Sequence, residues 1–454
     1  MLIRVLLAEA DYRDNRTHAI HSPSEANQIA NVSRKFFHGP ESQEAIRIIT
    51  TLRQAGFVAL LAGGCVRDAM LGKQPKDYDV ATDATPDAVR DVFGKKSTLA
   101  FGASFGVIGV LPQRDTKAST ASSTESTIQP TEVATFRSDG EYSDGRRPDS
   151  VHFGDAKQDA LRRDFTINGL FYDPHTDEVI DYVGGEADLQ AERLRTIGNP
   201  ADRFGEDKLR MLRAVRFATT LGFAIDPSTR DAIESFASQM NVVSGERIGA
   251  EMRRVFTSPS VVQGLRHLID CKLDETVLPE ISAVNLDQLA AKTNKLSNRS
   301  FAIVMACFLL QTDAPEQALA AIADRWKLSN EEVRQITAAI LHYPVIGGAD
   351  RLAWSVVQPI LIDRDAETII EVAEANSKSS DEAGIAIARR AMAMPRKELD
   401  PPPFLNGKDL KDLGIPAGPL YKSILQSIRD AQLDGKIHSR GEAITQAQQL
   451  SNSL

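Results

Sequence analysis

The strongest constraint on the fold is a change in the hydrophobic pattern of the chain at about Asp181. Before this point, short apolar runs end at glycines and polar turns; Phe57–Ala62, for instance, is followed by Gly63 and Gly64. After it, apolar residues recur at helical spacing and strand signals fade. This order predicts an α+β protein in which a small mixed sheet with flanking helices precedes an all-helical remainder.

Within the first part, apolar spacing predicts one helix over 41–54 and another over 65–71. Extended segments are expected at 57–62, 76–80, 105–110 and 132–136. Residues 116–127, TKASTASSTEST, form a Ser/Thr-rich insertion between two of these strands, for which a solvated loop is the simplest interpretation. Residues 1–40 are polar and aperiodic, so we expect a poorly ordered extension.

Composition narrows the class of protein further. The chain has 454 residues, enough for about three domains, and its 42% hydrophobic and 25% charged residues are typical of a globular chain with a sizeable core. Its most apolar stretch, 301–311, is too short to span a membrane, and its N-terminal sequence does not resemble a signal peptide. The three cysteines lie far apart, which indicates no disulfide framework and a cytoplasmic protein. Because the net charge is −9, any nucleic-acid surface must be built from local basic clusters.

Asp77 and Asp79 are the first residues that indicate chemistry. In a strand, residues two apart project from the same face, so both carboxylates would meet one ligand. Most isolated Asp-x-Asp pairs are solvated loop residues, but Mg²⁺, bound by a few carboxylates and substrate phosphates, fits this pair. The glycine turn at Gly63 and Gly64 lets backbone N–H groups approach a phosphate, and Arg67 can donate to the same group. Together they predict a nucleoside-triphosphate site with metal-assisted phosphoryl transfer.

Two further charged segments follow. Residues 162–168, RRDFTIN, precede an apolar run and are expected where a buried segment meets a polar cleft. In 206–217, Asp207 and Arg210 have the spacing of neighbours on one helix face. The simplest interpretation is an amphipathic helix with salt bridges. The alternative is a base reader, in which Asp207 accepts from an exocyclic amine and Arg210 donates to the ring, selecting C and A over U.

Seven motifs in order across about 45–260 make the chain resemble a known family. They are LAGGCVRD (61–68), KDYDVAT (76–82), DGEYSDGRRPDSVHF (139–153), RRDFTIN (162–168), DYVGGEADL (181–189), EDKLRMLRAVRFA (206–218) and ERIGAEM (246–252). The chain resembles the class II tRNA nucleotidyltransferase (CCA-adding enzyme) and bacterial poly(A) polymerase family, within the polymerase-β-like nucleotidyltransferase superfamily. A weaker match to CCA-adding members lies at 407–419.

The resemblance implies a catalytic site in the first part of the chain. Asp77 and Asp79 would hold two Mg²⁺ ions, and Glu132, which opens a neighbouring strand, is the candidate third carboxylate. Arg163 would contact the incoming nucleotide. The residues implied for the triphosphate are Gly63, Gly64 and Arg67.

A second set of residues is implied downstream. Asp207 and Arg210 would read the base without a nucleic-acid template, and Arg213 and Arg216 would support the base or the phosphate. The motif that braces this helix contributes Arg247 and Glu251.

Two features select an activity within the family. Residues 101–107, FGASFGV, resemble the Gly-x-x-Phe-Gly form of CCA-adding members rather than the GRRFxLAH run of poly(A) polymerases. Enzymes that add only CC tend to lack the flexible-loop element found here at 139–153. We therefore expect CCA addition to the 3′ end of tRNA from CTP and ATP. A poly(A) polymerase or an A-adding tRNA nucleotidyltransferase is the alternative, and a catalytically silent RNA-binding protein is a remote one, because both functional pairs are intact.

The expected organisation follows the same resemblance, and a proline-rich break at 400–404 separates the end of the chain from the helical middle. The expected domains are an extension (1–40), a nucleotidyltransferase catalytic head (41–183), a helical neck with base recognition (184–258), a helical body (259–396) and a tRNA-binding tail (397–454). Besides the nucleotides, tRNA is the expected partner, with no membrane and no other protein implied. The expected basic clusters are Arg146, Arg147, Lys157, Arg162 and Arg163 in the head, and Lys408, Lys411, Lys422 and Lys436 in the tail.

Overall fold

The computed structural model describes residues 39–102, 105–113, 129–140, 150–416 and 418–453. The described chain divides into two compact units, Met1–Gly198 and Asn199–Leu454. Most of the expected extension, the Ser/Thr-rich insertion and both Arg146 and Arg147 lie outside the described residues.

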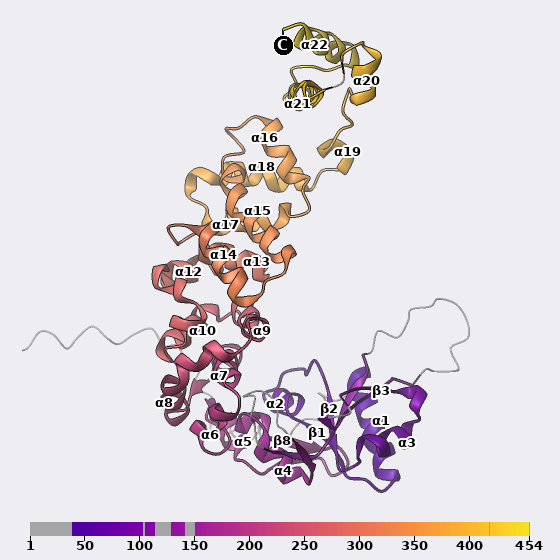
Figure 1. Ribbon diagram of the computed structural model, residues 1–454, viewed down its shortest axis with the longest axis vertical. Coiled ribbons are helices and arrows are strands. Elements are labelled where there is room, and N and C mark those ends of the chain that lie inside the picture. Colours follow the sequence, from indigo (N-terminus) through magenta and orange to yellow (C-terminus); the bar gives the residue numbers. More distant parts are fainter. Residues whose placement is uncertain (1–38, 103–104, 114–128, 141–149, 417, 454) are drawn as a thin grey trace, which may run out of the picture. The chain divides into compact units, whose positions relative to one another are not determined.

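The first unit contains the sheet and its helices (Figure 1). Its elements are α1 (Pro40–Gln54), β1 (Ala59–Ala62), α2 (Gly64–Met70), β2 (Asp79–Thr82), α3 (Pro86–Phe93), β3 (Thr98–Gly102), β4 (Val107–Val110), β5 (Thr131–Thr135), β6 (Arg137–Asp139), β7 (Val151–Phe153), α4 (Ala156–Arg162), β8 (Leu170–Asp173), β9 (Glu178–Asp181), α5 (Gly185–Gln190) and β10 (Arg193–Leu194).

Seven strands form a mixed sheet in the order β3-β4-β5-β2-β1-β8-β9. Neighbouring strands are antiparallel except for β2 and β5, which are parallel. All four residues of β1 and of β8 are buried, because helices such as α1 and α2 pack against the sheet. Strands β6 and β7 pair separately, and α4 packs against β6.

The second unit is helical apart from the two-residue strand β11 (Ala224–Ile225). Its helices are α6 (Pro200–Glu206), α7 (Leu209–Leu221), α8 (Pro227–Phe236), α9 (Gly245–Phe256), α10 (Val261–Asp270), α11 (Asp274–Val277), α12 (Leu286–Thr293), α13 (Phe301–Leu309), α14 (Pro315–Trp326), α15 (Asn330–Gly347), α16 (Trp354–Leu361), α17 (Ala366–Asn376), α18 (Glu382–Met392), α19 (Arg396–Leu399), α20 (Gly407–Asp412), α21 (Leu420–Leu433) and α22 (Arg440–Ser453).

Two features of this unit follow directly from the sequence. The most apolar stretch of the chain becomes α13, every residue of which is buried. The proline-rich break joins α19 to α20 without regular structure, and the segment beyond it has its own apolar cluster, which includes Leu410, Ile424 and Ile428. The predicted α+β class, with a mostly helical remainder, is therefore confirmed, whereas the finer domain boundaries remain predictions.

Candidate active site

The three predicted carboxylates gather at one end of neighbouring strands in the head. Asp79 is the first residue of β2, where pairing with Ala62 of β1 begins, and the parallel register of β2 and β5 brings Glu132 beside it. The prediction that Asp77 and Asp79 share a strand is wrong, because β2 begins only at Asp79. Asp77 lies just before the strand and still acts electrostatically on Asp79.

The electrostatics of this cluster fit a bound cation. Loss of hydration raises the pKa of Asp79 to about 6; repulsion from Glu132 and Asp77 adds to the rise, and Arg163 opposes it. The Asp79 side chain is exposed at the strand end, so solvent moderates the repulsion. Among the described residues, no three His, Cys, Asp or Glu side chains form a complete metal site. Since Mg²⁺ usually takes one or two carboxylates together with phosphates and water, the donors present fit an ion completed by a nucleotide.

The predicted glycine turn connects β1 to α2. Gly63 adopts φ 74°, a conformation that glycine accepts readily, and its N–H donates to the carbonyl of Leu170 at 2.9 Å. Gly63 therefore shapes the turn and ties it to β8. A backbone contact to phosphate remains a prediction for Gly64.

Arg67, on α2, is held by Asn168, to which no sequence pattern assigns a role. Its Nη1 donates to Oδ1 of Asn168 at 2.6 Å, and Nδ2 of Asn168 donates to Oδ1 of Asp164 at 3.0 Å. Arg67 also pairs with the neighbouring Asp68 at 2.7 Å. The RRDFTIN segment thus contributes to the site through its last residue as well as through its arginines.

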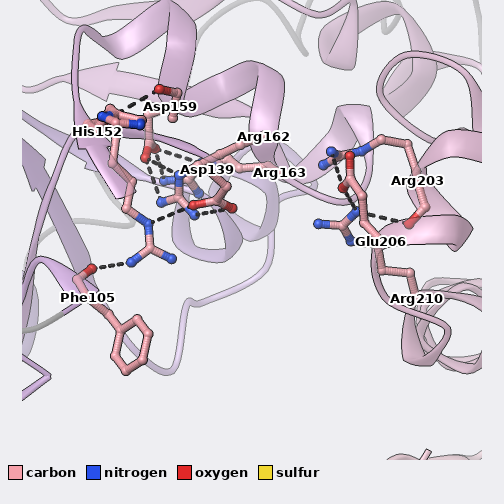
Figure 2. Close-up of polar contacts among 11 residues, drawn as sticks. Phe105, Asp139, His152, Asp159, Arg162, Arg163, Arg203, Glu206 and Arg210 are labelled. Carbon is pink, nitrogen blue, oxygen red and sulfur yellow. Dashed lines mark hydrogen bonds and ion pairs between the residues drawn. The ribbon is translucent and has the colours of Figure 1, made fainter. Parts of the chain in front are cut away.

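The Arg163 side chain lies between Asn168, at the end of the same segment, and the glycine turn. Its Nη1 donates to the carbonyl of Asn168 at 3.2 Å, and its guanidinium stacks over the ring of Phe171 at 5.1 Å. Its other nitrogens donate to Asp159 of α4, as Figure 2 shows. No motif assigns a role to Asp159, and its position four residues before Arg163 is the one sequence signal that indicates the pair.

The predicted base-reading pair does not lie on one helix. Asp207 is the C-cap of α6, with extended backbone, and α7 begins at Leu209. The Asp207 carboxylate interrupts the helix because it accepts the N–H of Leu209 at 3.0 Å, a local bond that competes with helical pairing. Its other oxygen accepts from Arg247 of α9 at 2.7 Å. Arg210 pairs instead with Glu206, and its Nη1 donates to the carbonyl of Arg203 at 3.0 Å (Figure 2).

The two remaining arginines of this segment face the bracing motif. Arg216 pairs with the buried carboxylate of Glu251 at 2.6 Å, and Arg213 approaches the same group at 3.9 Å. Arg216 also stacks on Phe217, with 3.9 Å between its guanidinium carbon and the ring centre. These contacts link α7 to α9, while the predicted nucleotide-binding role of both arginines remains untested.

The basic clusters differ in their availability to RNA. In the head, Lys157 is exposed, whereas Arg162 and Arg163 share the buried carboxylate of Asp159. In the tail the four predicted lysines are all exposed; they are Lys408, Lys411, Lys422 and Lys436.

The remaining sequence expectations concern cysteines and membranes. Cys65, Cys271 and Cys307 are all free and buried. Within the ranges that the structure describes, no helix combines the length and apolarity needed to cross a bilayer.

The fold and the clustered carboxylates define a nucleotidyltransferase with a polymerase-β-like head. The family model for the poly A polymerase head domain matches residues 59–195. Two further models match the helical part: the probable RNA and SrmB-binding site of polymerase A over 222–284, and the putative tRNA nucleotidyltransferase domain 2 over 296–447. Nucleotidyltransferases of this kind generally use a divalent metal ion.

Comparison with individual proteins is more specific. The chain is 33% identical to the CCA-adding enzyme of Geobacillus thermodenitrificans over 415 residues, covering 89% of this chain and 96% of that protein. It therefore belongs to the CCA-adding enzyme family. Its structure resembles that of the Bacillus stearothermophilus CCA-adding enzyme in complex with CTP, with a TM-score of 0.71, 28% identity and coverage of 91% and 98% of the two chains. The fold is also shared with the Thermotoga maritima CCA-adding enzyme complexed with tRNA, with a TM-score of 0.61, 19% identity and coverage of 92% and 98%.

Proposed function

We propose that this protein adds CCA to the 3′ end of tRNA from CTP and ATP, without a nucleic-acid template and with Mg²⁺ as its divalent ion. The observation that carries the proposal is the 33% identity to a CCA-adding enzyme across 89% of the chain, which spans the head and the helical parts together. The carboxylate cluster and the Asp207 segment, which the chemistry requires, are both present in this chain.

The reaction joins the RNA 3′-hydroxyl oxygen to the α-phosphate of the nucleotide, while the bond between the α- and β-phosphates breaks and pyrophosphate leaves. Asp77 and Asp79 would hold two Mg²⁺ ions, with Glu132 as a third carboxylate beside them. Bound Mg²⁺ would neutralise the charge that develops on the attacking and leaving oxygens. Arg67 and Arg163 would bind triphosphate oxygens through charge-assisted hydrogen bonds.

Base selection would depend on the Asp207 carboxylate. Arg247 and the Leu209 N–H each occupy one lone pair, so each oxygen retains a second one for an exocyclic amine. Cytosine and adenine offer such an amine, whereas uracil would present a carbonyl oxygen to the carboxylate. Arg210, held by Glu206, would donate to the ring of the same base.

The test is nucleotide addition by purified protein to tRNA that lacks its CCA end, with each nucleotide alone and in pairs. CTP alone should add two residues, CTP and ATP together should add three, and UTP or GTP should add none. An A-adding enzyme would extend only tRNA that already ends in CC, and a poly(A) polymerase would extend unrelated RNA repeatedly with ATP alone. Either result would contradict the proposal.

The assignment of Asp77 and Asp79 as metal ligands is tested separately, by substitution. Asp77→Ala and Asp79→Ala should each abolish addition while tRNA binding stays nearly unchanged, because neither residue is expected to contact the tRNA body. Turnover within about tenfold of the wild-type rate in either variant would contradict the two-metal assignment.

A further inference from the structure

Asp159, on α4 of the head, is a buried aspartate whose two carboxylate oxygens each bind a different arginine. Its side chain is 1% exposed. Oδ1 accepts Nε and Nη2 of Arg162 at 2.8 and 2.6 Å, and Oδ2 accepts Nε and Nη2 of Arg163 at 3.1 and 2.9 Å (Figure 2). Each oxygen therefore serves one arginine.

The Arg163 guanidinium, which Asp159 Oδ2 binds, lies near the proposed nucleotide site. With Asp159 on one edge, the guanidinium also meets the Asn168 carbonyl at 3.2 Å and the Phe171 ring at 5.1 Å. Its Nη1 lies 2.7 Å from where a Cβ on Gly63 would be, so only glycine leaves room for it above the turn. The arginine is thus held in one position over the glycine turn.

Arg162, which Asp159 Oδ1 binds, contacts the β6–β7 pair instead. Arg162 approaches Asp139 of β6 at 3.9 Å, and Asp139 pairs with Arg137 at 3.2 Å. Arg137 in turn donates to the carbonyl of Phe105. The contacts to Oδ1 therefore join α4 to the β6–β7 pair, and only those to Oδ2 act on the nucleotide site.

Stability alone does not account for a carboxylate in this place. Burial would raise the pKa of Asp159, but Arg163 and Arg162 outweigh it and hold the pKa below its usual range, so the group stays ionised. Buried ion pairs recover little of the cost of desolvating their charges, and apolar residues of similar volume are often at least as stable. A conformational role for the charge is the better explanation of its position.

We propose that Asp159 is a positioning residue, which fixes the Arg163 guanidinium above Gly63 so that it meets the triphosphate of the incoming nucleotide in one orientation. The inference rests on the nucleotide-binding role of Arg163 in the proposed function. Without the carboxylate, the long arginine side chain must be ordered at the moment of binding, and the lost conformational freedom weakens affinity for every nucleotide equally. Such a uniform effect raises KM and leaves kcat largely unchanged.

The test is a double-mutant cycle on the full-length protein, with kcat and KM for CTP and ATP measured on tRNA lacking its CCA end. Arg163→Ala should raise KM about tenfold or more, and Asp159→Asn about tenfold, with kcat of Asp159→Asn within about threefold of wild type. Adding Asp159→Asn to Arg163→Ala should change KM by less than about twofold, because the positioning effect acts only through Arg163.

The matched control is Asp173→Asn in the same unit. Asp173, the last residue of β8, is also buried and pairs with an arginine, Arg53 of α1, at 2.6 Å. This variant should lower the unfolding temperature about as much as Asp159→Asn while leaving KM for both nucleotides unchanged. An equal rise in KM for the control would assign the effect to general loosening of the head and would overturn the proposal.

The remaining outcomes separate the two levels of inference. An unchanged KM in Arg163→Ala would refute the nucleotide-binding role of Arg163, and with it the proposed function of that residue. A raised KM in Arg163→Ala with an unchanged KM in Asp159→Asn would refute only the positioning role, as would equal effects of Asp159→Asn in both backgrounds. If Asp159→Asn does not fold, Asp159→Glu, which keeps the charge but displaces it by one methylene, takes its place in the same cycle.

Discussion

Replacement of Asp79 by Asn should abolish nucleotide addition and yet stabilise the nucleotide-free protein at neutral pH. The pKa of Asp79 rises from 3.8 to about 6 in the folded chain, first through desolvation and then through repulsion by Glu132. The folded state therefore binds a proton more tightly than the unfolded state. Protonation of Asp79 therefore contributes to the free energy of unfolding, fully below about pH 4, and this contribution is lost as the pH rises through about 6. At pH 7.5 the ionised carboxylate lowers the stability of the folded state.

The size of this effect follows from the shift and from exposure. A change in pKa from 3.8 to about 6 corresponds to about 3 kcal/mol for a fully buried group. Because the Asp79 side chain is exposed, solvent screening reduces the expected gain for Asp79→Asn to about 1 kcal/mol.

The measurement is urea unfolding of both proteins, followed by circular dichroism in EDTA without nucleotide. The gain should be present at pH 7.5 and should shrink as the pH is lowered towards 4. Asp91→Asn, an exposed aspartate on α3, is the control and should change stability by less than about 0.5 kcal/mol. CTP with Mg²⁺ should stabilise the wild type and not Asp79→Asn. A variant less stable than wild type at pH 7.5, or a gain independent of pH, would refute the reasoning.

Three further predictions concern base choice, the glycine turn and acid stability. Asp207→Ala should lower the ratio of kcat/KM for CTP over UTP by about tenfold to a hundredfold, since a mismatched base no longer faces the carboxylate; an unchanged ratio would show that Asp207 does not read the base. Gly63→Ala should raise KM for both nucleotides at least about tenfold, because the new Cβ would lie 2.7 Å from Nη1 of Arg163 and because Gly63 has a φ of +74°, which alanine adopts poorly. A wild-type KM would contradict the proposed position of the Arg163 guanidinium. Hydrogen bonds from Arg253 lower the pKa of Glu332 to about 2, so this pair should add about 1 kcal/mol of stability that is lost as the pH falls from about 4.5 to 2. Glu332→Gln should lack that acid-dependent loss in urea unfolding, and an identical pH dependence in both proteins would rule out the contribution of the pair.

Much of the fold was predictable because it depends on local pattern. Helix α1 was expected over 41–54 from the helical spacing of its apolar residues and forms at Pro40–Gln54, with Ala45, Ile49 and Leu52 buried as that spacing predicts. The strands β1, β4 and β5 lie within one or two residues of their expected segments. The order of motifs likewise indicated the family, which the comparison confirmed over most of the chain.

Local spacing was misleading where a side chain or a strand end competed with the regular element. Asp77 and Asp79 alternate as strand residues do, but the strand begins at Asp79, where its partner strand begins to pair. Asp207 and Arg210 have helical spacing, but the Asp207 carboxylate caps the Leu209 N–H and separates the two helices. In both cases the period of the sequence was right and the boundary was wrong.

What the sequence by itself determined is therefore the set of chemical groups and the elements that carry them. Tertiary structure alone decided which groups became partners: Glu132 reaches Asp79 through the parallel pairing of two strands, and Arg247 reaches Asp207 across 40 residues of chain. The physical reason is that a helix or strand is specified by neighbours a few residues away, whereas an ion pair depends on where packed elements bring two charges within about 3 Å. Asp159 combines both, because its contact with Arg163 is local, but the position of Arg163 beside Gly63 of the glycine turn exists only once the head has folded.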